Sequence, residues 1–438
     1  MKPVFKTSER NIDNTGRELV TAKLQQLIDE TAQAEGVLLL EKGRYLTSSL
    51  FLKSNMEFCL EEGAVLLGAT DESQYPVLPA RVAGIEMDWY PGLLNCNGQR
   101  NVVISGAGMV DGQGEYWWNK YWGSDGKGGM RKEYDEKGLR WACDYDCMRV
   151  RNVVVMDSSD IILRDFTSAR SGFWNVHICY SRNIHIDGIK ISAGDMESPS
   201  TDGIDIDSCE HVLVENCVTS CNDDSICIKS GRDADGAAVN RPCHDITIRN
   251  CEILSGFGVT IGSEVSGGVY DVTISNLKYH GTDCGFRIKS SVARKGYIKN
   301  ILVDGLEMVN VKYPFHLFLN WNPAYSICEL PGDYTGEIPR HWRKLLNPVA
   351  GEVPNTKVSD IVIRNVKAYN EPDYQGISRA FHIEGFADQP ISRLTFEDVS
   401  LSCKEFGVIN HTGDVAFIRT EVSVSGAHDR QNDEYDNR

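Results

Sequence analysis

The stretches NIHIDGIKIS (residues 183–192), HVLVENCVTS (211–220) and DITIRNCEIL (245–254) decide the fold, because they repeat one short pattern. In each, a polar or charged residue precedes apolar residues at alternate positions, and a second alternating stretch follows a polar break. Alternation with a period of two, rich in β-branched residues, is typical of half-buried β-strands. The three stretches therefore predict a chain built from repeated short strands.

The same pattern recurs from residue 101 to residue 402, and seven of its nine copies open with Asn or Asp. Successive copies from Asp160 to Asn300 begin 23, 28, 34, 26 and 29 residues apart. These periods are typical of solenoids, whereas helical repeats need about 33–45 residues and amphipathic helices. We therefore predict an all-β chain folded as a parallel β-helix. The nine copies begin at Asn101, Asp160, Asn183, His211, Asp245, Asp271, Asn300, Asp360 and Arg393.

The N-terminal segment is predicted to be a short capping helix at about residues 14–35. Thr15-x-x-Glu18 has the form of a capping box, and apolar residues follow at helical spacing before Gly36. A helix here would cover the first coil of a solenoid, which otherwise exposes unpaired backbone.

Two insertions and a tail interrupt the repeat within one predicted domain, residues 1–425. Residues 113–145 and 312–358 are rich in aromatic residues, so we expect loops that either stack on a sugar or cover the core. Residues 426–438 are polar, and we expect a disordered tail.

Composition excludes several classes of partner. The formal net charge of −17 argues against nucleic acid and against anionic membranes, and no apolar run is long enough to cross a membrane. No secretory signal is visible at the start, so we expect a cytoplasmic protein unless the sequence begins after a removed signal. The 14 cysteines are interpreted as buried apolar side chains, and neither a metal site nor a cofactor is predicted. The sequence says nothing of the oligomeric state.

Spacing suggests a site on one face of the solenoid. Asp202 precedes the pair Asp223–Asp224 by 21 residues, close to one coil, and Arg287 and Lys289 follow about two coils later. Equivalent positions in successive coils stack about 4.8 Å apart, so these side chains can converge. Paired carboxyls suit glycoside hydrolysis, in which one donates a proton and another activates water. Turn formation alone would also explain acidic residues at these positions.

Four segments of the chain carry a resemblance to a known family. They closely resemble the signature blocks of family 28 glycoside hydrolases, the polygalacturonases, and they occur in the family's order. The resemblance implies a right-handed parallel β-helix and an inverting hydrolysis that needs no metal or cofactor. The segments are SPSTDGIDIDSCEHVLVENC (198–217), CNDDSICIKSGRDADG (221–236), GFGVTIGSEVSGG (256–268) and GTDCGFRIKS (281–290).

The resemblance also implies roles for single residues. Asp223 matches the family's general acid, and Asp202 and Asp224 match the carboxylates that hold and activate water. Arg287 and Lys289 match the cations that bind a galacturonate carboxylate beside the scissile bond. The expected function is hydrolysis of an α-galacturonide bond, with exo action on short pectic oligosaccharides.

The chain departs from the family pattern at two positions, and two further residues are weaker candidates. Ser200 replaces an Asn in the first block, and Phe257 replaces the His of the Gly-His-Gly block, a His thought to tune the acid. Phe257 implies an altered sugar specificity, a degenerate enzyme, or another residue in the role of the His. His177 and Glu264 are candidate sugar contacts, with a structural His and a solvated turn acid as the alternatives.

Three alternatives stay open at this point. Action on rhamnogalacturonan oligosaccharides would give Phe257 a methyl group to contact, but would leave Arg287 and Lys289 without an obvious partner. A pectate lyase would need calcium held by carboxylates such as Asp223 and Asp224. A non-catalytic carbohydrate-binding solenoid would explain the absence of the His.

Overall fold

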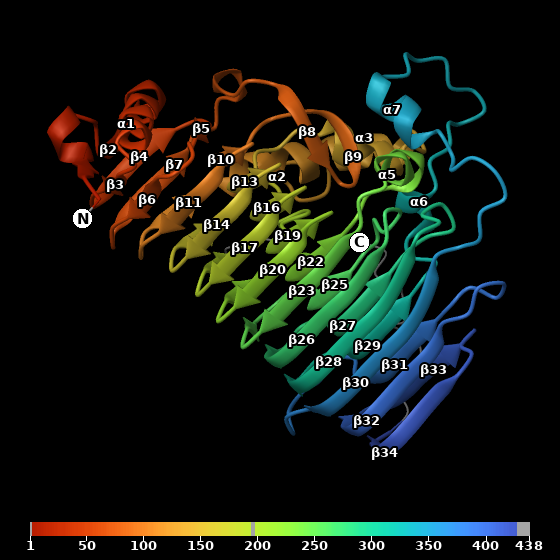
Figure 1. The fold of residues 1–438 in the computed structure, drawn as a ribbon. Coiled ribbons are helices and arrows are strands. Elements are labelled where there is room, and N and C mark those ends of the chain that lie inside the picture. Colours follow the sequence, from red (N-terminus) through yellow and green to blue (C-terminus); the bar gives the residue numbers. More distant parts are fainter. Residues whose placement is uncertain (1, 194–197, 427–438) are drawn as a thin grey trace.

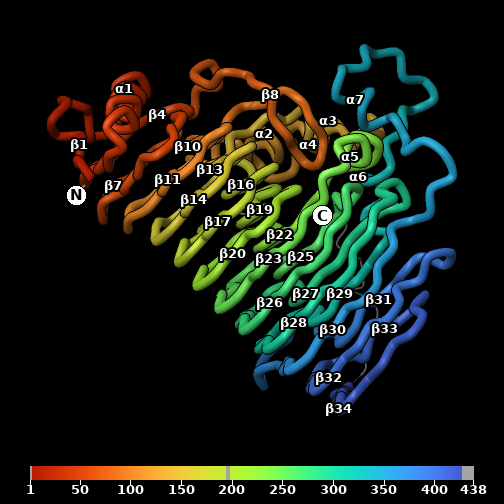
Figure 2. Tube along the Cα trace, in the orientation of Figure 1, coloured from red at the N-terminus to blue at the C-terminus, as the bar shows by residue number. Residues whose placement is uncertain are grey.

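The protein is a right-handed parallel β-helix, as the sequence predicts. A computed structural model describes residues 2–193 and 198–426, and its coils stack in sequence order along one axis (Figures 1 and 2). Of the tail predicted at residues 426–438, all but Gly426 lies outside the described residues.

Two large parallel sheets form the walls of the solenoid within the described residues. Sheet B has 11 strands, one from each coil that it crosses. These are β5 (Leu50–Phe51), β10 (Leu94–Asn97), β13 (Val153–Met156), β16 (Val176–Cys179), β19 (Ile204–Asp207), β22 (Ile226–Lys229), β25 (Val259–Ile261), β27 (Cys284–Lys289), β29 (Tyr313–Phe318), β31 (Arg379–Glu384) and β33 (Glu405–Asn410).

Sheet A has 21 strands within the described residues, and its later strands are long because two shorter ones merge. The strands are β1 (Val4–Lys6), β2 (Thr15–Leu19), β3 (Val37–Leu40), β4 (Gly43–Thr47), β6 (Glu57–Leu60), β7 (Ala64–Gly68), β11 (Arg100–Ser105), β12 (Met109–Asp111), β14 (Ser159–Arg164), β15 (Thr167–Ala169), β17 (Arg182–Asp187), β18 (Lys190–Ser192), β20 (Glu210–Glu215), β21 (Val218–Ser220), β23 (Cys243–Arg249), β24 (Glu252–Ile253), β26 (Val269–His280), β28 (Tyr297–Val309), β30 (Lys357–Tyr369), β32 (Ser392–Cys403) and β34 (Val415–Val424).

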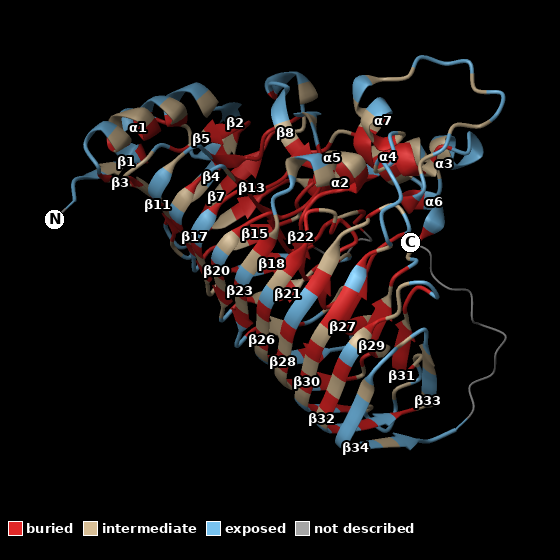
Figure 3. Ribbon diagram, turned by 45° about the vertical axis from the view of Figure 1, so that its right-hand side comes forward, coloured by how far each residue is buried: buried red, intermediate tan, exposed pale blue. Residues whose placement is uncertain are grey.

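The register of sheet B separates a core row from an outward row. Ile204, Ile226 and Val259 are paired in successive coils and are fully buried in the solenoid core. Because side chains alternate along a strand, the next residues, Asp205 and Cys227 among them, project from the other face of the sheet. The core is continuous along the axis (Figure 3). Polar side chains in the outward row are therefore held by a rigid wall.

The first residue of each repeat adopts a left-handed backbone conformation. All nine predicted repeat starts have positive φ, between 50° and 60°. Asn and Asp tolerate this region better than other non-glycine residues, which explains why they open seven of the nine copies. Their side chains also bond between coils, as from Asn183 Nδ2 to Asp160 Oδ1 at 3.0 Å and from Asn300 Nδ2 to Asp271 Oδ1 at 3.0 Å.

The N-terminal cap is confirmed, but its predicted start is wrong. Helix α1 spans Thr21–Gln33 and buries Leu24, Leu27 and Ile28 against the first coil. Its Gln25 side chain bonds both the N–H and the C=O of Phe51, so it satisfies the free edge of β5. The supposed capping box is strand β2, because Asp13 accepts bonds from the backbone of Thr15, Arg17 and Glu18 and forms a turn before the strand.

The first insertion is helical, contrary to the prediction of a loop. It forms α2 (Gly114–Trp122), α3 (Gly129–Glu136) and α4 (Arg140–Asp146). Trp117, Trp118 and Trp141 are buried, because these helices pack over the core instead of presenting the aromatic rings to solvent. The second insertion contains α6 (Pro323–Ser326) and α7 (Arg340–Leu345).

A hairpin and the insertion helices lie together along one margin of the solenoid (Figure 1). The hairpin is antiparallel and consists of β8 (Leu78–Val82) and β9 (Ile85–Trp89). The remaining elements are α5 (Asp233–Val239) and the 3₁₀ turns η1 (Thr7–Arg10) and η2 (Glu72–Gln74). In the described part of the chain, no helix is both long and apolar enough to cross a membrane.

The left-handed repeat position generates a stability prediction. We expect Asn183→Val to lower the free energy of unfolding by at least about 1–2 kcal/mol, because a β-branched residue is strained at positive φ, and because the bond to Asp160 is lost. Asn183→Gly is the matched control, since glycine adopts this conformation freely. Thermal unfolding of both variants would measure the difference, and an equal loss in both would contradict the explanation.

Candidate active site

Five of the predicted residues converge on the outward face of sheet B. Asp202 precedes β19, Asp223 and Asp224 precede β22, and Arg287 and Lys289 belong to β27. The backbone N–H of Gly203 donates to the C=O of Asp224, so the two acidic turns lie directly one above the other. One carboxylate oxygen from each of the three aspartates lies within 4.8 Å of the others.

Asp224 is the carboxylate with the most cationic surroundings. Lys289 Nζ lies 2.7 Å from its Oδ2, Thr260 Oγ1 donates to its Oδ1 at 2.7 Å, and Arg287 Nη1 lies 3.3 Å from the same oxygen. Burial alone would raise the pKa of Asp224, but the Lys289 ammonium and the Arg287 guanidinium hold it well below its ordinary value.

Asp202 has a different environment, because it shares its cation. Lys229 Nζ lies 3.5 Å from Asp202, 3.4 Å from Asp205 and 3.5 Å from Glu264. Burial and the neighbouring carboxyls of Asp205 and Asp223 raise the pKa of Asp202 well above its ordinary value. Asp205 is fully buried, and burial raises its pKa to about 8.

Asp223 is the half-exposed member of the cluster, and a glycine turn positions it. Burial and the charge of Asp224 raise the pKa of Asp223. Its C=O accepts a bond from the N–H of Phe257 at 3.0 Å. Gly256 is at φ 92°, and a Cβ there would meet the Asp223 oxygen at 2.4 Å, so the glycine is required for this approach. The backbone turn at residues 256–258 therefore still contacts Asp223, although its middle residue is Phe257 and not a histidine.

Phe257, which takes the position of the histidine in the family pattern, contacts a cation. Its ring lies 4.6 Å from the guanidinium carbon of Arg287, and Trp321 approaches the same guanidinium at 5.7 Å. Lys289 Nζ lies 4.4 Å from the centre of the Trp321 ring. Aromatic faces attract cations, so both residues hold the two cations toward Asp224.

Glu264 and His177 differ in their relation to the site. Glu264 lines the cavity beside Asp202 and Asp223, where Lys229 and neighbouring arginines lower its pKa to about 2 despite its burial. It is buried and therefore not a solvated turn acid. His177 is not among the residues that line this cavity. Burial lowers its pKa to about 4, and its Nδ1 lies 2.7 Å from Arg151 Nη1.

The cavity is narrow, about 80 Å³, and the insertions roof it. Ala83 of the β8–β9 turn, Arg140 of α4 and Tyr325 of α6 line it opposite the aspartates. A fully buried ion pair ties the hairpin down, with Arg81 Nε 2.8 Å from Asp207 Oδ2. The site is thus enclosed by segments that the repeat does not contain.

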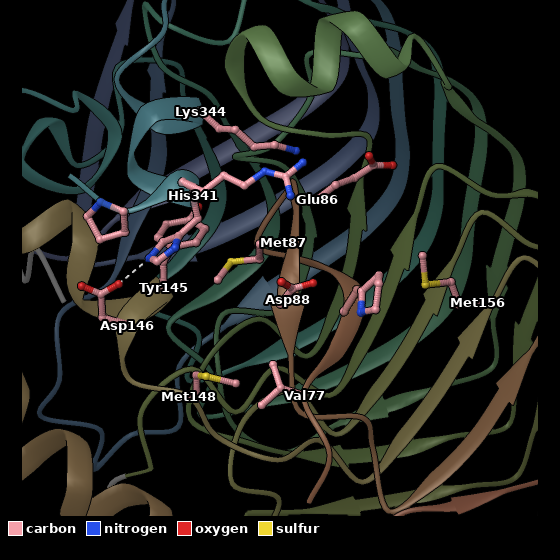
Figure 4. A pocket seen from close by; sticks show the side chains of 14 residues that line it. Val77, Glu86, Met87, Asp88, Tyr145, Asp146, Met148, Met156, His341 and Lys344 are labelled. Atoms are coloured by element: carbon pink, nitrogen blue, oxygen red, sulfur yellow. Dashed lines mark hydrogen bonds and ion pairs between the residues drawn. The ribbon is translucent and has the colours of Figure 1, made fainter. Parts of the chain in front are cut away.

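A larger cavity of about 700 Å³ is lined by residues of the β8–β9 hairpin, α4 and α7 (Figure 4). His341 Nε2 is 2.5 Å from Asp146 Oδ1 on one of its walls, and Met87, Met148 and Met156 line it as well. The aspartates of the narrow cavity do not line it. Its volume suits a ligand, but Arg287 and Lys289 do not line it either.

The acidic clusters are compatible with a cation by spacing, yet side-chain cations already pair with them. Asp202, Asp223 and Asp224 form one group of suitable spacing, and Asp202, Asp205 and Cys227 form another. Lys289 and Arg287 pair with the first group, and Lys229 pairs with the second. A divalent ion would have to compete with these three side chains.

The arrangement combines two carboxyls of raised pKa with one carboxylate of lowered pKa in a pocket lined by cations. Such a separation of pKa values assigns an acid and a base for hydrolysis of a glycosidic bond. The sequence profile of the glycosyl hydrolases family 28 matches residues 83–329, more than half of the chain and the part that holds this cluster. The chain belongs to this family. It is a glycoside hydrolase of the polygalacturonase type.

Individual relatives agree with the family assignment. A protein of Vitis vinifera described as a probable polygalacturonase is 31% identical over 398 residues, which cover 88% of this chain and 72% of that protein. An endo-polygalacturonase of Pectobacterium carotovorum is 25% identical and covers 67% of the chain and 70% of its own length. The crystal structure of an exopolygalacturonase from Thermotoga maritima superposes with a TM-score of 0.74 at 26% identity, covering 95% and 92% of the two chains.

Sequence reasoning missed residues that matter to the geometry. Asp205 lies three residues after Asp202 in the same block, and its strand register with Cys227 would have placed it beside the cluster. Trp321 was visible in the second aromatic insertion, but nothing in the sequence located it over Lys289. The hairpin that supplies Ala83 has no repeat pattern and was not predicted.

The Arg81–Asp207 pair generates a prediction about the roof. We expect Arg81→Met to cost about 3–5 kcal/mol of stability, because it leaves a buried carboxylate unpaired. The double variant Arg81→Met with Asp207→Leu should recover much of the loss. Arg10→Met is the control, since its exposed partner Glu30 makes a surface pair worth about 0–1 kcal/mol. Chemical denaturation of the wild type and these three variants would measure their free energies of unfolding, and a double variant no more stable than Arg81→Met would contradict the explanation.

Proposed function

We propose that the protein hydrolyses an α-galacturonide bond in short pectic oligosaccharides, working from a chain end and inverting the anomeric centre. The observation that carries the proposal is the cluster of Asp202, Asp223 and Asp224 beside Arg287 and Lys289, four of which line one narrow cavity while Asp224 pairs with the two cations behind it. The name polygalacturonase, borne by the relatives, supports a pectic substrate.

In the proposed reaction, Asp223 protonates the leaving glycosidic oxygen. Its raised pKa keeps the proton available for transfer. Its side chain is half-exposed, so the glycosidic oxygen of a substrate in the cavity can approach it. Asp202 and Asp224 orient the attacking water, and Asp202 takes its proton, since the low pKa of Asp224 makes that carboxylate a weak base. The carboxyl oxygens lie closer than the usual inverting separation of about 6.5–9.5 Å, so the anomer of the product needs a direct test.

Arg287 and Lys289 are proposed to bind the carboxylate of the sugar beside the scissile bond. Each of these cations forms an ion pair with Asp224. Arg287 Nε, however, is buried without a hydrogen-bond partner and can donate a hydrogen bond to a ligand. A galacturonate carboxylate would satisfy this donor.

The roof of the cavity supports exo action. Ala83, Arg140 and Tyr325, from three separate segments, line the cavity together with Asp202 and Asp223, and its small volume of about 80 Å³ favours a chain end over the middle of a long polymer. The similar Thermotoga maritima structure bears the name exopolygalacturonase, which supports the same mode. Short oligomers also suit a chain of net charge −17, which repels long polyanions.

Phe257 supports a second candidate function, hydrolysis of rhamnogalacturonan oligosaccharides. Its ring partly lines the cavity and could contact the methyl group of a rhamnose on the leaving side. The cations Arg287 and Lys289 favour galacturonate at that position, so this function ranks second.

A product assay in the presence of a chelator tests both functions. We expect the enzyme to release free galacturonate from digalacturonate and, one unit at a time, from polygalacturonate. Asp223→Asn should lower kcat by about 10²–10⁴-fold, the usual contribution of a general acid. Asp271→Asn, an exposed change on sheet A, is the control and should keep the activity.

Each other outcome has a defined meaning. Galacturonate released from rhamnogalacturonan oligomers alone would move the assignment to the second function. A mixture of oligomers early in the reaction would contradict exo action. An unsaturated product absorbing in the ultraviolet, lost with chelator, would indicate a lyase. Full activity in Asp223→Asn would remove that residue from catalysis.

A further inference from the structure

Asp205 is a buried carboxyl that the proposed reaction does not use. Its exposed fraction is 0%, and neither of its carboxyl oxygens has a hydrogen-bond partner. It does not line the cavity, although Asp202, three residues earlier, does. A charged carboxylate without hydrogen bonds is costly to bury, so its surroundings must determine its charge.

The charges around Asp205 are unbalanced. Among the described residues, its one ion pair is with Lys229, which also lies 3.5 Å from both Asp202 and Glu264. Arg287 and Lys289 pair with Asp224 and not with Asp205. The titratable and charged groups that face it from the neighbouring coils and turns are His177, Arg151, Cys227, Lys229, Asp202, Asp223 and Asp224.

Three carboxylates share Lys229, and Arg151, the other cation that faces Asp205, forms no ion pair with it among the described residues. Glu264 also lies in the field of Arg232 and Arg294, which help to keep it charged. Asp202 borders the cavity, where water can solvate its charge, whereas Asp205 has neither water access nor a hydrogen bond. Of the two aspartates that share Lys229, Asp205 is therefore the one that is better off neutral.

We propose that Asp205 is a positioning residue that keeps its proton through the reaction and so leaves Lys229 to hold the Asp202 carboxylate toward the attacking water. The inference rests on the proposed hydrolase function. The contact of Lys229 with the ring of Trp174, whose centre is 4.9 Å from Nζ, fixes the ammonium from the other side. Burial raises the pKa of Asp205 to about 8 and also raises the pKa of Asp202, so one carboxyl of this pair can readily keep a proton, and the lack of a hydrogen bond and of water access selects Asp205.

The pH dependence of kcat distinguishes the protonation states. Asp224 stays ionised, so the acid limb of the profile reports the ionisation of Asp202. If Asp205 is neutral, Asp205→Asn replaces one neutral group by another and the acid limb stays where it is in the wild type. If Asp205 is charged, the substitution removes a repelling charge, lowers the pKa of Asp202 and moves the limb to lower pH, which would overturn the proposal.

Substitutions of Lys229 provide a second test in the same pH experiment. Lys229→Met removes the cation that favours ionised Asp202, so its pKa rises and the acid limb moves up by about one unit or more, where one unit is a tenfold change in the equilibrium. Lys229→Arg should restore the limb toward the wild-type position. A limb unmoved in a folded Lys229→Met variant would show that Lys229 does not act on Asp202 and would equally overturn the proposal.

A measurement without substrate separates this proposal from the function on which it rests. The infrared difference spectrum between wild type and Asp205→Asn at neutral pH should contain the C=O band of a protonated carboxyl. A carboxylate band in its place would overturn the proposal even in an active enzyme. If the band is that of a protonated carboxyl but the protein hydrolyses no galacturonide, the protonation of Asp205 is supported and the hydrolase function is rejected. Asp271→Asn, whose carboxyl is exposed, is the spectral control.

Discussion

The in-register stacking of successive coils is the constraint on which the whole molecule depends. Parallel pairing places each residue of sheet B about 4.8 Å from its equivalent in the next coil. A residue therefore has a fixed neighbour above and below, whatever the length of the connection between them. Apolar neighbours such as Ile204 and Ile226 build the core by this rule, and the polar residues on the other face become a site by the same rule. The left-handed residue at each repeat start keeps the corners of the coils equivalent.

The stacking explains why the fold and the aspartates were predictable. The repeat is local, and its alternation and its Asn or Asp openings can be recognised within about ten residues. Asp202, Asp223 and Asp224 follow from the same periodicity, supported by the family's blocks. The capping box failed because a short-range signal at Thr15 competed with the turn formed by Asp13 and with pairing to β4. The first aromatic insertion was predicted as loops because burial of Trp117 and Trp118 depends on distant packing that no local pattern encodes.

The site depends on an unequal distribution of cations among similar carboxyls. Asp224 has two cations and a hydroxyl donor, and its pKa falls. Asp202 and Asp205 have one lysine between them, and their pKa values rise. These residues are all aspartates on adjoining coils, so sequence cannot separate their protonation states. The difference arises from Lys229, Arg287 and Lys289, whose long side chains reach across coils and pair with some carboxyls and not with others.

Phe257 stands where the family pattern has a histidine, and its contacts explain how the proposed acid, Asp223, can keep its environment without that histidine. A histidine beside Asp223 would add a titrating neighbour, whereas Phe257 adds an apolar face. Burial and the charge of Asp224 raise the pKa of Asp223 without such a neighbour. The backbone of Phe257 still positions Asp223 through its N–H, a bond that does not depend on the side chain. Its ring holds Arg287, and through Arg287 it stabilises the charge of Asp224. Phe257 therefore places no proton-exchanging side chain beside Asp223 and preserves the charge asymmetry between Asp223 and Asp224, which is the asymmetry that the proposed acid and base roles require.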